Sequence, residues 1–211
     1  MEALELLDYR RRVTALYAEA REGGGEDPEG AWLRWRSGRD ELLATHPQSP
    51  VPAQARESFA GMAFHPYDHR WRAEVEVEPF EGSVATVAHS GSGVSDWVAV
   101  GQLRPGGAWG DGQLTLLWLA SYGGGIFLPF GDATNGVSTY GGGRYLLDTV
   151  KGADLGPAAG PGRRLVLDAN YAYHPSCAHD PRWSCPLAPP GNRLAVAVEA
   201  GELAPRHGAH P

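Results

Sequence analysis

The chain has 211 residues, and its 29 glycines and 17 prolines occupy 46 of these positions. Average use of these two residue types is about 12%, so the backbone of this chain turns often. Its 20 aromatic residues and 42% hydrophobic content argue against a disordered chain, and the many turns argue against a long helical bundle. The composition predicts one domain of short strands and tight turns, or one domain with a small appendage.

Charge and hydropathy exclude further classes of protein. Lysine and arginine number 18 against 25 aspartates and glutamates, which gives a net charge of −7. An acidic chain without a basic stripe is a poor nucleic-acid binder, because phosphate neutralisation supplies most of that affinity. No run of about 18 apolar residues is present and no apolar signal segment opens the chain. We therefore expect a cytoplasmic protein with reduced cysteines and no nucleic-acid or membrane partner. The oligomeric state is left open.

The first third of the chain has helical periodicity. Apolar residues recur at spacings of three and four from Leu6 to Ala20, which predicts an amphipathic helix that ends at Gly23. Asp27 and Pro28 are typical of an N-cap and first helical turn, and His46 before Pro47 ends this second helix. We divide the chain into an N-terminal helical segment packed on the core (1–52), an antiparallel β domain (53–203) and a flexible tail (204–211).

Beyond about Trp71 the apolar pattern changes to the period of a strand. Apolar residues at 71, 73, 75 and 77 alternate with charged ones, which predicts a half-buried strand. Further strands are predicted at 83–89, 97–103, 113–121, 125–130, 143–147, 164–168 and 194–200. Turn residues separate them, and strands do not alternate with helices. The fold class is therefore mainly β, a single antiparallel β-barrel or curved sandwich with two N-terminal α-helices.

Arg144 follows a run of three glycines. A guanidinium fixed beside a glycine turn can clamp the carboxylate or phosphate of a ligand. It can equally pair with an internal acid, for which Asp132 and Asp168 are the candidates. The sequence leaves both interpretations open.

The two cysteines lie in a segment that also contains histidines. Cys177, Cys185, His174 and His179 place four soft metal ligands within twelve residues, but their spacing matches no standard zinc motif. Packed free thiols, a disulfide, a metal site and a nucleophilic Cys177 with a histidine base are the alternatives. We assign no metal site and leave the cofactor open.

Two motifs carry a family resemblance. From Phe130 the chain reads F-x-D-x-T-x-G-x-x-T-Y-x-G-G-R-Y-L, and from Cys185 it reads C-P-L-x-P-P-x-N-R-L. With these motifs the chain resembles an uncharacterised bacterial and archaeal family, a domain of unknown function. The resemblance implies no activity. His174 and His179 depart from the family pattern, so a metal site built on them would not be a family property.

The polar residues that match the family lie in loops rich in glycine and proline. One explanation is a buried hydrogen-bond network that holds the 170–193 loop on the sheet. The other is a ligand site near Arg144, at the barrel mouth. To this site we assign Asp132, Tyr140, Arg144, Asn170, Tyr173, Cys177, Asn192 and Arg193.

We predict a protein of unknown function that is a soluble small-molecule-binding domain, with an anion among the expected ligands. One alternative is a hydrolase-type enzyme with a loop site around Arg144 and Cys177. The other is a structural or partner-binding protein.

Overall fold

The computed structural model describes residues 2–80, 82, 84–160 and 163–206. Helices α1 (Glu2–Gly23), α2 (Pro28–Thr45) and the short α3 (Ala53–Arg56) come first in the chain. The strands that follow are β1 (Arg72–Glu76), β2 (Glu78–Pro79), β3 (Val84–Ala88), β4 (Val94–Leu103), β5 (Leu114–Leu119), β6 (Ile126–Phe130), β7 (Arg144–Asp148) and β8 (Arg164–Asp168). Short 3₁₀ turns precede, connect or follow the strands. None of the described helices combines the length and apolarity that crossing a membrane requires.

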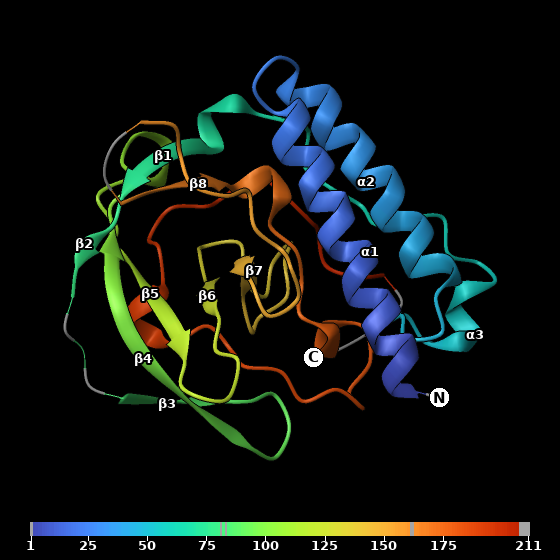
Figure 1. Cartoon of the computed structure of the whole chain (residues 1–211). Coiled ribbons are helices and arrows are strands. Elements are labelled where there is room, and N and C mark those ends of the chain that lie inside the picture. Colours follow the sequence, from blue (N-terminus) through green and yellow to red (C-terminus); the bar gives the residue numbers. More distant parts are fainter. Residues whose placement is uncertain (1, 81, 83, 161–162, 207–211) are drawn as a thin grey trace.

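The two predicted N-terminal helices are confirmed, and local chemistry sets their ends. The Oδ1 atom of Asp27 accepts a hydrogen bond from the Gly30 backbone N–H at 3.0 Å, and Pro28 opens the helix. His46 takes an extended conformation before Pro47 and ends α2. The two helices lie side by side across one face of the molecule (Figure 1).

The strands form two antiparallel sheets. One sheet has two strands, β1 and β8, with Arg72 opposite Asp168. The other has six strands in the order β2-β4-β5-β6-β7, with β3 paired to β4. Among the described residues neither sheet closes on itself, so the predicted barrel is not confirmed and the curved sandwich fits (Figure 1).

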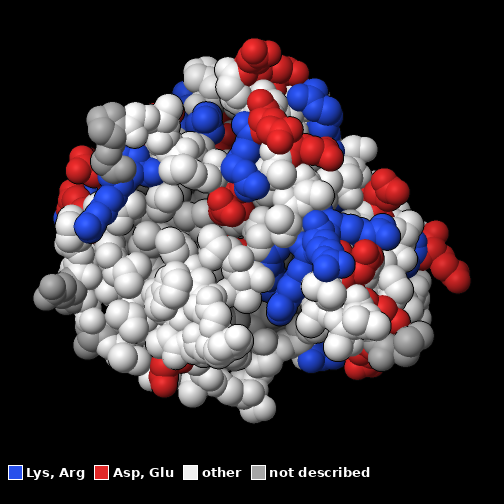
Figure 2. All heavy atoms as spheres, viewed as in Figure 1, with Lys and Arg blue, Asp and Glu red and all other residues white. Residues whose placement is uncertain are grey.

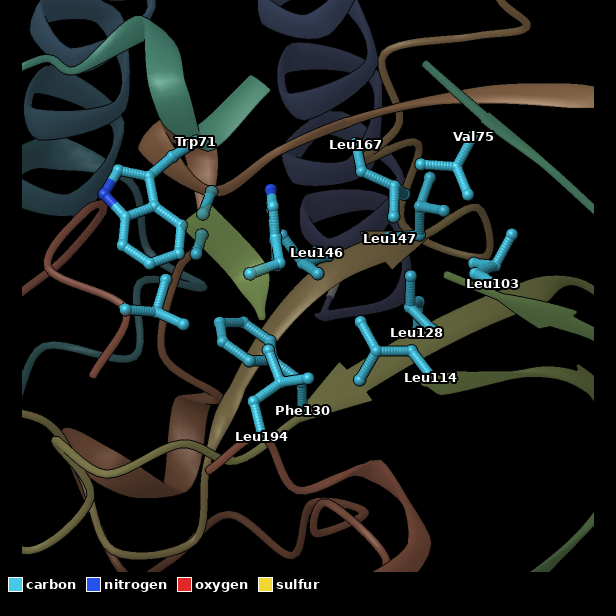
Figure 3. Close-up of a cluster of buried hydrophobic side chains, with 14 of the residues drawn as sticks. Trp71, Val75, Leu103, Leu114, Leu128, Phe130, Leu146, Leu147, Leu167 and Leu194 are labelled. Carbon is cyan, nitrogen blue, oxygen red and sulfur yellow. The ribbon is translucent and has the colours of Figure 1, made fainter. Parts of the chain in front are cut away.

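The main core fills the space between the two sheets. Side chains from both sheets point toward one another there (Figure 3). Trp71 and Trp109 meet edge to face with ring centroids 5.6 Å apart. The buried members drawn and labelled in the figure are Trp71, Val75, Leu103, Leu114, Leu128, Phe130, Leu146, Leu147, Leu167 and Leu194.

A second core joins the helices to the larger sheet. Tyr17 and Trp35 of the helices meet edge to face, and Phe127 of β6 stacks on Trp97 of β4 at 4.7 Å. Trp32 of α2 also donates from its indole Nε1 to the Asn170 carbonyl oxygen at 2.8 Å. The helical segment therefore shares buried surface with the β strands. The domain boundaries at residues 52 and 203 stay a prediction.

The predicted strand at 194–200 is wrong. The segment has alternating apolar residues but forms no strand within the described residues. In its first half, the Leu194 N–H donates to the Gly131 carbonyl oxygen and the Val196 carbonyl oxygen accepts from the Ala133 N–H, at 2.8 and 3.1 Å. In its second half, the carbonyl oxygens of Val198 and Ala200 accept hydrogen bonds from the Arg144 side chain. At these two residues a buried side chain thus satisfies backbone groups that a neighbouring strand would have satisfied.

Two other predictions reach beyond the described residues. The predicted strand at 83–89 starts at Ser83, which lies outside them, and β3 is seen from Val84 to Ala88. Residues 207–211 of the predicted tail also lie outside them. Within the described part of that segment, the Ala204 backbone N–H donates to the Ser138 carbonyl oxygen at 2.9 Å.

Gly201 provides a test of how tightly the C-terminal segment approaches the rest of the chain. Its φ is +76°, and a Cβ at this position would lie 2.6 Å from the carbonyl oxygens of both Ala169 and Ala172. We expect Gly201→Ala to lower the free energy of unfolding by about 3 kcal/mol, because positive φ and steric overlap add. Urea denaturation measures this loss.

The matched control is Gly123→Ala. Gly123 has a similar φ of +86° but no atom within 4 Å of the added Cβ, so we expect a loss of only about 1 kcal/mol. Equal losses in the two variants would contradict the close approach.

Candidate functional site

Arg144 opens β7, and its side chain has no exposed surface. Its Nη2 donates to Asp132 Oδ2 at 2.9 Å and to the Val198 carbonyl oxygen at 2.9 Å. Burial lowers the pKa of Arg144, and the Asp132 carboxylate opposes that effect. A buried charge needs such partners because its desolvation costs several kcal/mol. Of the two internal acids considered from the sequence, Asp132 and not Asp168 pairs with Arg144.

Two buried asparagines act in the same way toward the backbone. The Asn192 side chain accepts from the Thr115 N–H at 2.8 Å and donates to the carbonyl oxygens of Thr115 and Pro129. The Asn170 side chain accepts from the Asp68 N–H and donates to the Asp68 carbonyl oxygen, each at 3.0 Å. Neither side chain has exposed surface. The sequence offered two explanations for these polar residues, a buried hydrogen-bond network and a ligand site. The contacts of these two asparagines, like those of Arg144 and Asp132, fit the buried network.

Glu202 is a second buried charge, between α2 and the C-terminal segment. Its Oε1 accepts from Arg39 Nε at 2.6 Å, and its Oε2 accepts from the His174 backbone N–H at 2.7 Å. Burial alone would raise the pKa of Glu202, but Arg39 and His174 lower it well below its usual range. Glu202 is therefore ionised and holds Arg39 in place.

His174 is not placed to act as a base for Cys177. Its Nε2 accepts from the Tyr140 backbone N–H at 3.1 Å, and its Nδ1 lies 3.4 Å from Glu202 Oε2. Burial lowers the pKa of His174, which favours the neutral ring. A neutral ring that accepts at Nε2 carries its proton on Nδ1. Its Nε2 therefore faces the Tyr140 backbone and its Nδ1 faces Glu202, so neither nitrogen is directed at Cys177.

A cavity of about 230 Å³ lies between α1, α2 and the loop of residues 173–186. Its lining includes the cations Arg10, Arg39 and Lys151, and none of the described residues that line it is an aspartate or glutamate. Lys and Arg side chains gather over the middle of α1 on this face of the molecule (Figure 2). The rest of the lining is largely aromatic or aliphatic, with Tyr9, Tyr17, Tyr173 and Trp183 as the rings.

The cavity wall contains polar atoms that the protein leaves unused. The hydroxyls of Tyr17 and Tyr173 and the indole N–H of Trp183 have no hydrogen-bond partner among the described residues. Burial raises the pKa of both tyrosines, so their hydroxyls stay protonated. Of the described hydrogen bonds, the one made by Arg39 uses its Nε, and none uses its two terminal nitrogens. Buried polar groups nearly always have partners, so these three donors stand out among the residues that line the cavity.

The structure separates the residues that the sequence grouped into one site. Arg144 and Asp132 form a closed pair, Asn170 and Asn192 hold backbone, and Arg193 is exposed. Tyr140 and Cys177 lie together, with 3.8 Å between the hydroxyl and the thiol sulfur. Tyr173 lines the cavity.

Sequence reasoning missed the three cations of the cavity. One of them left a signal, because Arg39 lies four residues after Trp35 and three before Leu42, on the apolar face of its helix. A charged residue on a buried helical face indicates a buried partner or a cavity. Arg10 and Lys151 carry no such signal, since nothing local shows that the loop of residues 173–186 packs beside them.

The structure defines the class of protein. It is a curved antiparallel sandwich that is covered by two helices and closed by an irregular C-terminal segment. The chain belongs to the family described as "Protein of unknown function (DUF1684)", whose model matches residues 57–203. Membership of an uncharacterised family is thus confirmed, and the two motifs themselves stay predictions.

One solved structure shows the same fold. It is the solution NMR structure of the uncharacterized protein from gene locus rrnAC0354 of Haloarcula marismortui, which is 30% identical in sequence with a TM-score of 0.59. The match covers 83% of this chain and 93% of that chain. No curated protein matches the chain.

Arg144→Lys tests the network. A lysine ammonium cannot reach the dispersed acceptors that the planar guanidinium serves, so we expect the free energy of unfolding to fall by about 3 kcal/mol. Arg193→Lys is the control at an exposed arginine, where we expect a change within about 0.5 kcal/mol. Chemical denaturation measures both values, and an unchanged stability for Arg144→Lys would rule out a structural role.

Proposed function

We propose that the protein binds a small organic anion with an apolar or aromatic body in the cavity between α1, α2 and the loop of residues 173–186. The observation that carries this proposal is the lining of the cavity, which combines three cations with buried, unused hydrogen-bond donors. This ligand class was predicted from the sequence, but the proposed place differs from the predicted position near Arg144.

The charge of the lining supports an anion because it opposes the charge of the whole chain. The protein carries −7 overall, yet the described residues that line the cavity include cations and no acid. Glu202 and Asp148 lie behind the wall and pair with Arg39 and Lys151, at 2.6 Å and 3.0 Å. Arg10 has no ion pair among the described residues. It is therefore the positive charge that a ligand would neutralise.

The size and apolar character of the cavity limit the body of the ligand. An apolar cavity of about 150 Å³ binds benzene, and drug-sized ligands occupy about 300–1,000 Å³. At about 230 Å³, this cavity suits a benzene-sized ring or a short aliphatic chain that carries one acidic group. The rings of Tyr9, Tyr17 and Tyr173 supply the apolar contacts.

Ligand binding can be tested with matched anions and alcohols. Hexanoate and benzoate carry the acidic group, and hexanol and benzyl alcohol have similar shapes without the charge. We expect the anions to raise the melting temperature and to stabilise the fold by about 2.7 kcal/mol at 100 times Kd. We expect at most a weak effect from the alcohols. Stabilisation by neither anion, or equally by the alcohols, would overturn the proposal.

Variants of two neighbouring arginines on α1 localise the effect within this test. We expect Arg10→Gln to weaken anion binding about threefold to tenfold, because an exposed charge contributes about 1 kcal/mol. Arg11→Gln changes the same charge at a residue that does not line the cavity, and we expect no change. Calorimetric titration measures both affinities. Equal weakening in the two variants would indicate a nonspecific charge effect.

The Tyr173 hydroxyl gives a prediction of a different kind. Because this buried hydroxyl has no hydrogen-bond partner within residues 2–80, 82, 84–160 and 163–206, we expect Tyr173→Phe to leave the unliganded protein as stable as the parent, or slightly more stable. We expect the same variant to weaken anion binding severalfold. Thermal unfolding with and without benzoate separates the two effects.

Tyr145→Phe is the matched control for Tyr173→Phe. The Tyr145 hydroxyl donates to the Pro186 carbonyl oxygen at 2.5 Å, so its removal should cost about 1–2 kcal/mol without ligand. A similar loss for Tyr173→Phe would show that its hydroxyl already has a structural partner.

A further inference from the structure

A second cleft, of about 310 Å³, lies where the two-stranded sheet of β1 and β8 meets the connection between α1 and α2. Residues 72 and 74 of β1 and 166 and 168 of β8 line it together, because cross-strand neighbours share one face of a sheet. The helix connection and these two strands lie in the same upper part of Figure 1. The described linings of this cleft and of the cavity between α1, α2 and the loop of residues 173–186 share no residue.

The described lining of this cleft carries two positive and two negative side chains, which are Arg21, Arg72, Glu74 and Asp168. Two of them have partners outside the cleft. Arg21 Nη1 donates to the Asp154 carbonyl oxygen at 2.7 Å. Glu74 Oε2 pairs with Arg164 Nη2 at 3.4 Å. The Arg72 side chain, in contrast, forms no salt bridge or hydrogen bond within the described residues. Its charge is therefore available to a ligand.

Asp168 uses one of its two carboxylate oxygens inside the protein. Its Oδ1 accepts hydrogen bonds from the backbone N–H of Asn170 at 2.9 Å and from the Asn170 side-chain Nδ2 at 2.7 Å. No hydrogen bond within the described residues uses Oδ2. The residue is 4% exposed and lines the cleft. Asn170 thus holds the carboxylate in one orientation and leaves the second oxygen for a donor from outside the protein.

The two available charges are neighbours. Arg72 lies directly opposite Asp168 in the antiparallel pair of β1 and β8, where the Cβ atoms of facing residues are about 4.5–5.5 Å apart. The two side chains form no salt bridge with each other. The C-terminal end of α1 and the N-terminal end of α2 also border the cleft, at Gly24 and Pro28. Helix ends of these two kinds favour positive and negative charge respectively. The cleft can therefore recognise both charges of one small molecule.

The environment of Asp168 makes its charge depend on pH near neutrality. Burial raises the pKa of Asp168 to about 6, against the opposing effects of the Asn170 hydrogen bonds and of Arg72. Burial, and next the charge of Asp168, raise the pKa of the Tyr67 and Tyr171 hydroxyls, so both stay neutral. The other charged residues of the described lining are Arg21 and Glu74. A ligand ammonium group needs the ionised carboxylate, so its affinity should fall as the pH falls through about 6.

We propose that this cleft binds a free α-amino acid with an aliphatic side chain, with the ligand ammonium group on Asp168 and its carboxylate on Arg72. A ligand with one charge would leave either the buried carboxylate or the arginine without a partner. The cleft lies at the lower end of the usual volumes of ligand sites. The apolar contacts come from Ala20, Leu155, Pro157, Ala159 and Val166. This second site goes beyond the proposed function and does not depend on it.

The ligand class is tested by calorimetric titration of the full chain at neutral pH with three probes of similar shape. Leucine carries both charges, leucinol carries only the ammonium group, and isocaproate carries only the carboxylate. We expect leucine to bind, and each singly charged probe to bind at least about tenfold more weakly, because each loses a hydrogen-bonded charge pair. No binding of leucine up to millimolar concentration, or equal binding of leucinol or isocaproate, would overturn the inference.

Matched variants localise leucine binding to the cleft. We expect Arg72→Gln and Asp168→Asn each to weaken it at least about tenfold. Arg163→Gln removes the same charge at an exposed residue just before β8 that does not line the cleft, and we expect no change. Arg10→Gln should also leave leucine binding unchanged, because Arg10 lines the other cavity. Equal weakening by Arg163→Gln would indicate a nonspecific charge effect and overturn the site.

The Asp168→Asn variant also gives a pH test. An asparagine keeps the oxygen that accepts from Asn170, and thermal unfolding without ligand checks that the variant is folded. Between pH 7 and pH 5 we expect the parent to lose about tenfold in leucine affinity, as Asp168 takes up a proton, and the variant to show no such loss. A parent affinity that does not change over this range would contradict the role of Asp168. If Asp168→Asn does not fold, the parent profile and Arg72→Gln decide. Absence of leucine binding leaves the benzoate result, and with it the proposed function, unaffected.

Discussion

The buried guanidinium of Arg144 is the contact on which the C-terminal third of the structure depends. An irregular segment that packs against a sheet must find donors for its carbonyl oxygens, because buried backbone groups cost free energy when they lack partners. Arg144 offers donors in one plane, and it joins Asp132 to the carbonyl oxygens of Val198 and Ala200. The buried amides of Asn170 and Asn192 do the same at two further points. At these points, side chains therefore take the place of a neighbouring strand.

The parts of the fold that follow local rules were predictable from the sequence. The cap at Asp27 begins α2 and the extended residue before Pro47 ends it where expected, and β8 (Arg164–Asp168) has the bounds that its pattern predicted. The segment 194–200 has an equally good strand pattern and forms no strand. Its apolar residues are buried for the same reason as those of a strand, but the carbonyl oxygens of Val198 and Ala200 accept from a side chain of another element. The periodicity of apolar residues in a sequence indicates which side chains are buried. It does not indicate which groups form hydrogen bonds with the backbone of that segment.

The candidate site was predictable only in part, and for a related reason. Tyr173 was named from its loop and lines the cavity. The residues grouped around Arg144 were chosen because polar groups in rigid loops are typical of binding sites, and the same pattern is typical of a buried network. The cavity depends on the packing of α1 and α2 against a loop more than a hundred residues later in the chain. Only Arg39, a charge between Trp35 and Leu42 on a buried helical face, pointed toward it from sequence.

The pairing of β1 with β8 affects how the chain can fold. It places Arg72 opposite Asp168, and the indole of Trp32 donates a hydrogen bond to the backbone of Asn170. Strand β1 and helix α2 can therefore gain these contacts only after the segment around Asp168 has been synthesised. Such high contact order slows folding, because loop closure must be completed before these contacts are gained. On the ribosome, Trp71 and the aromatic face of α2 stay partly uncovered until the residues around Asp168 have emerged. During synthesis, these apolar surfaces thus stay exposed until the late segments of the chain have emerged.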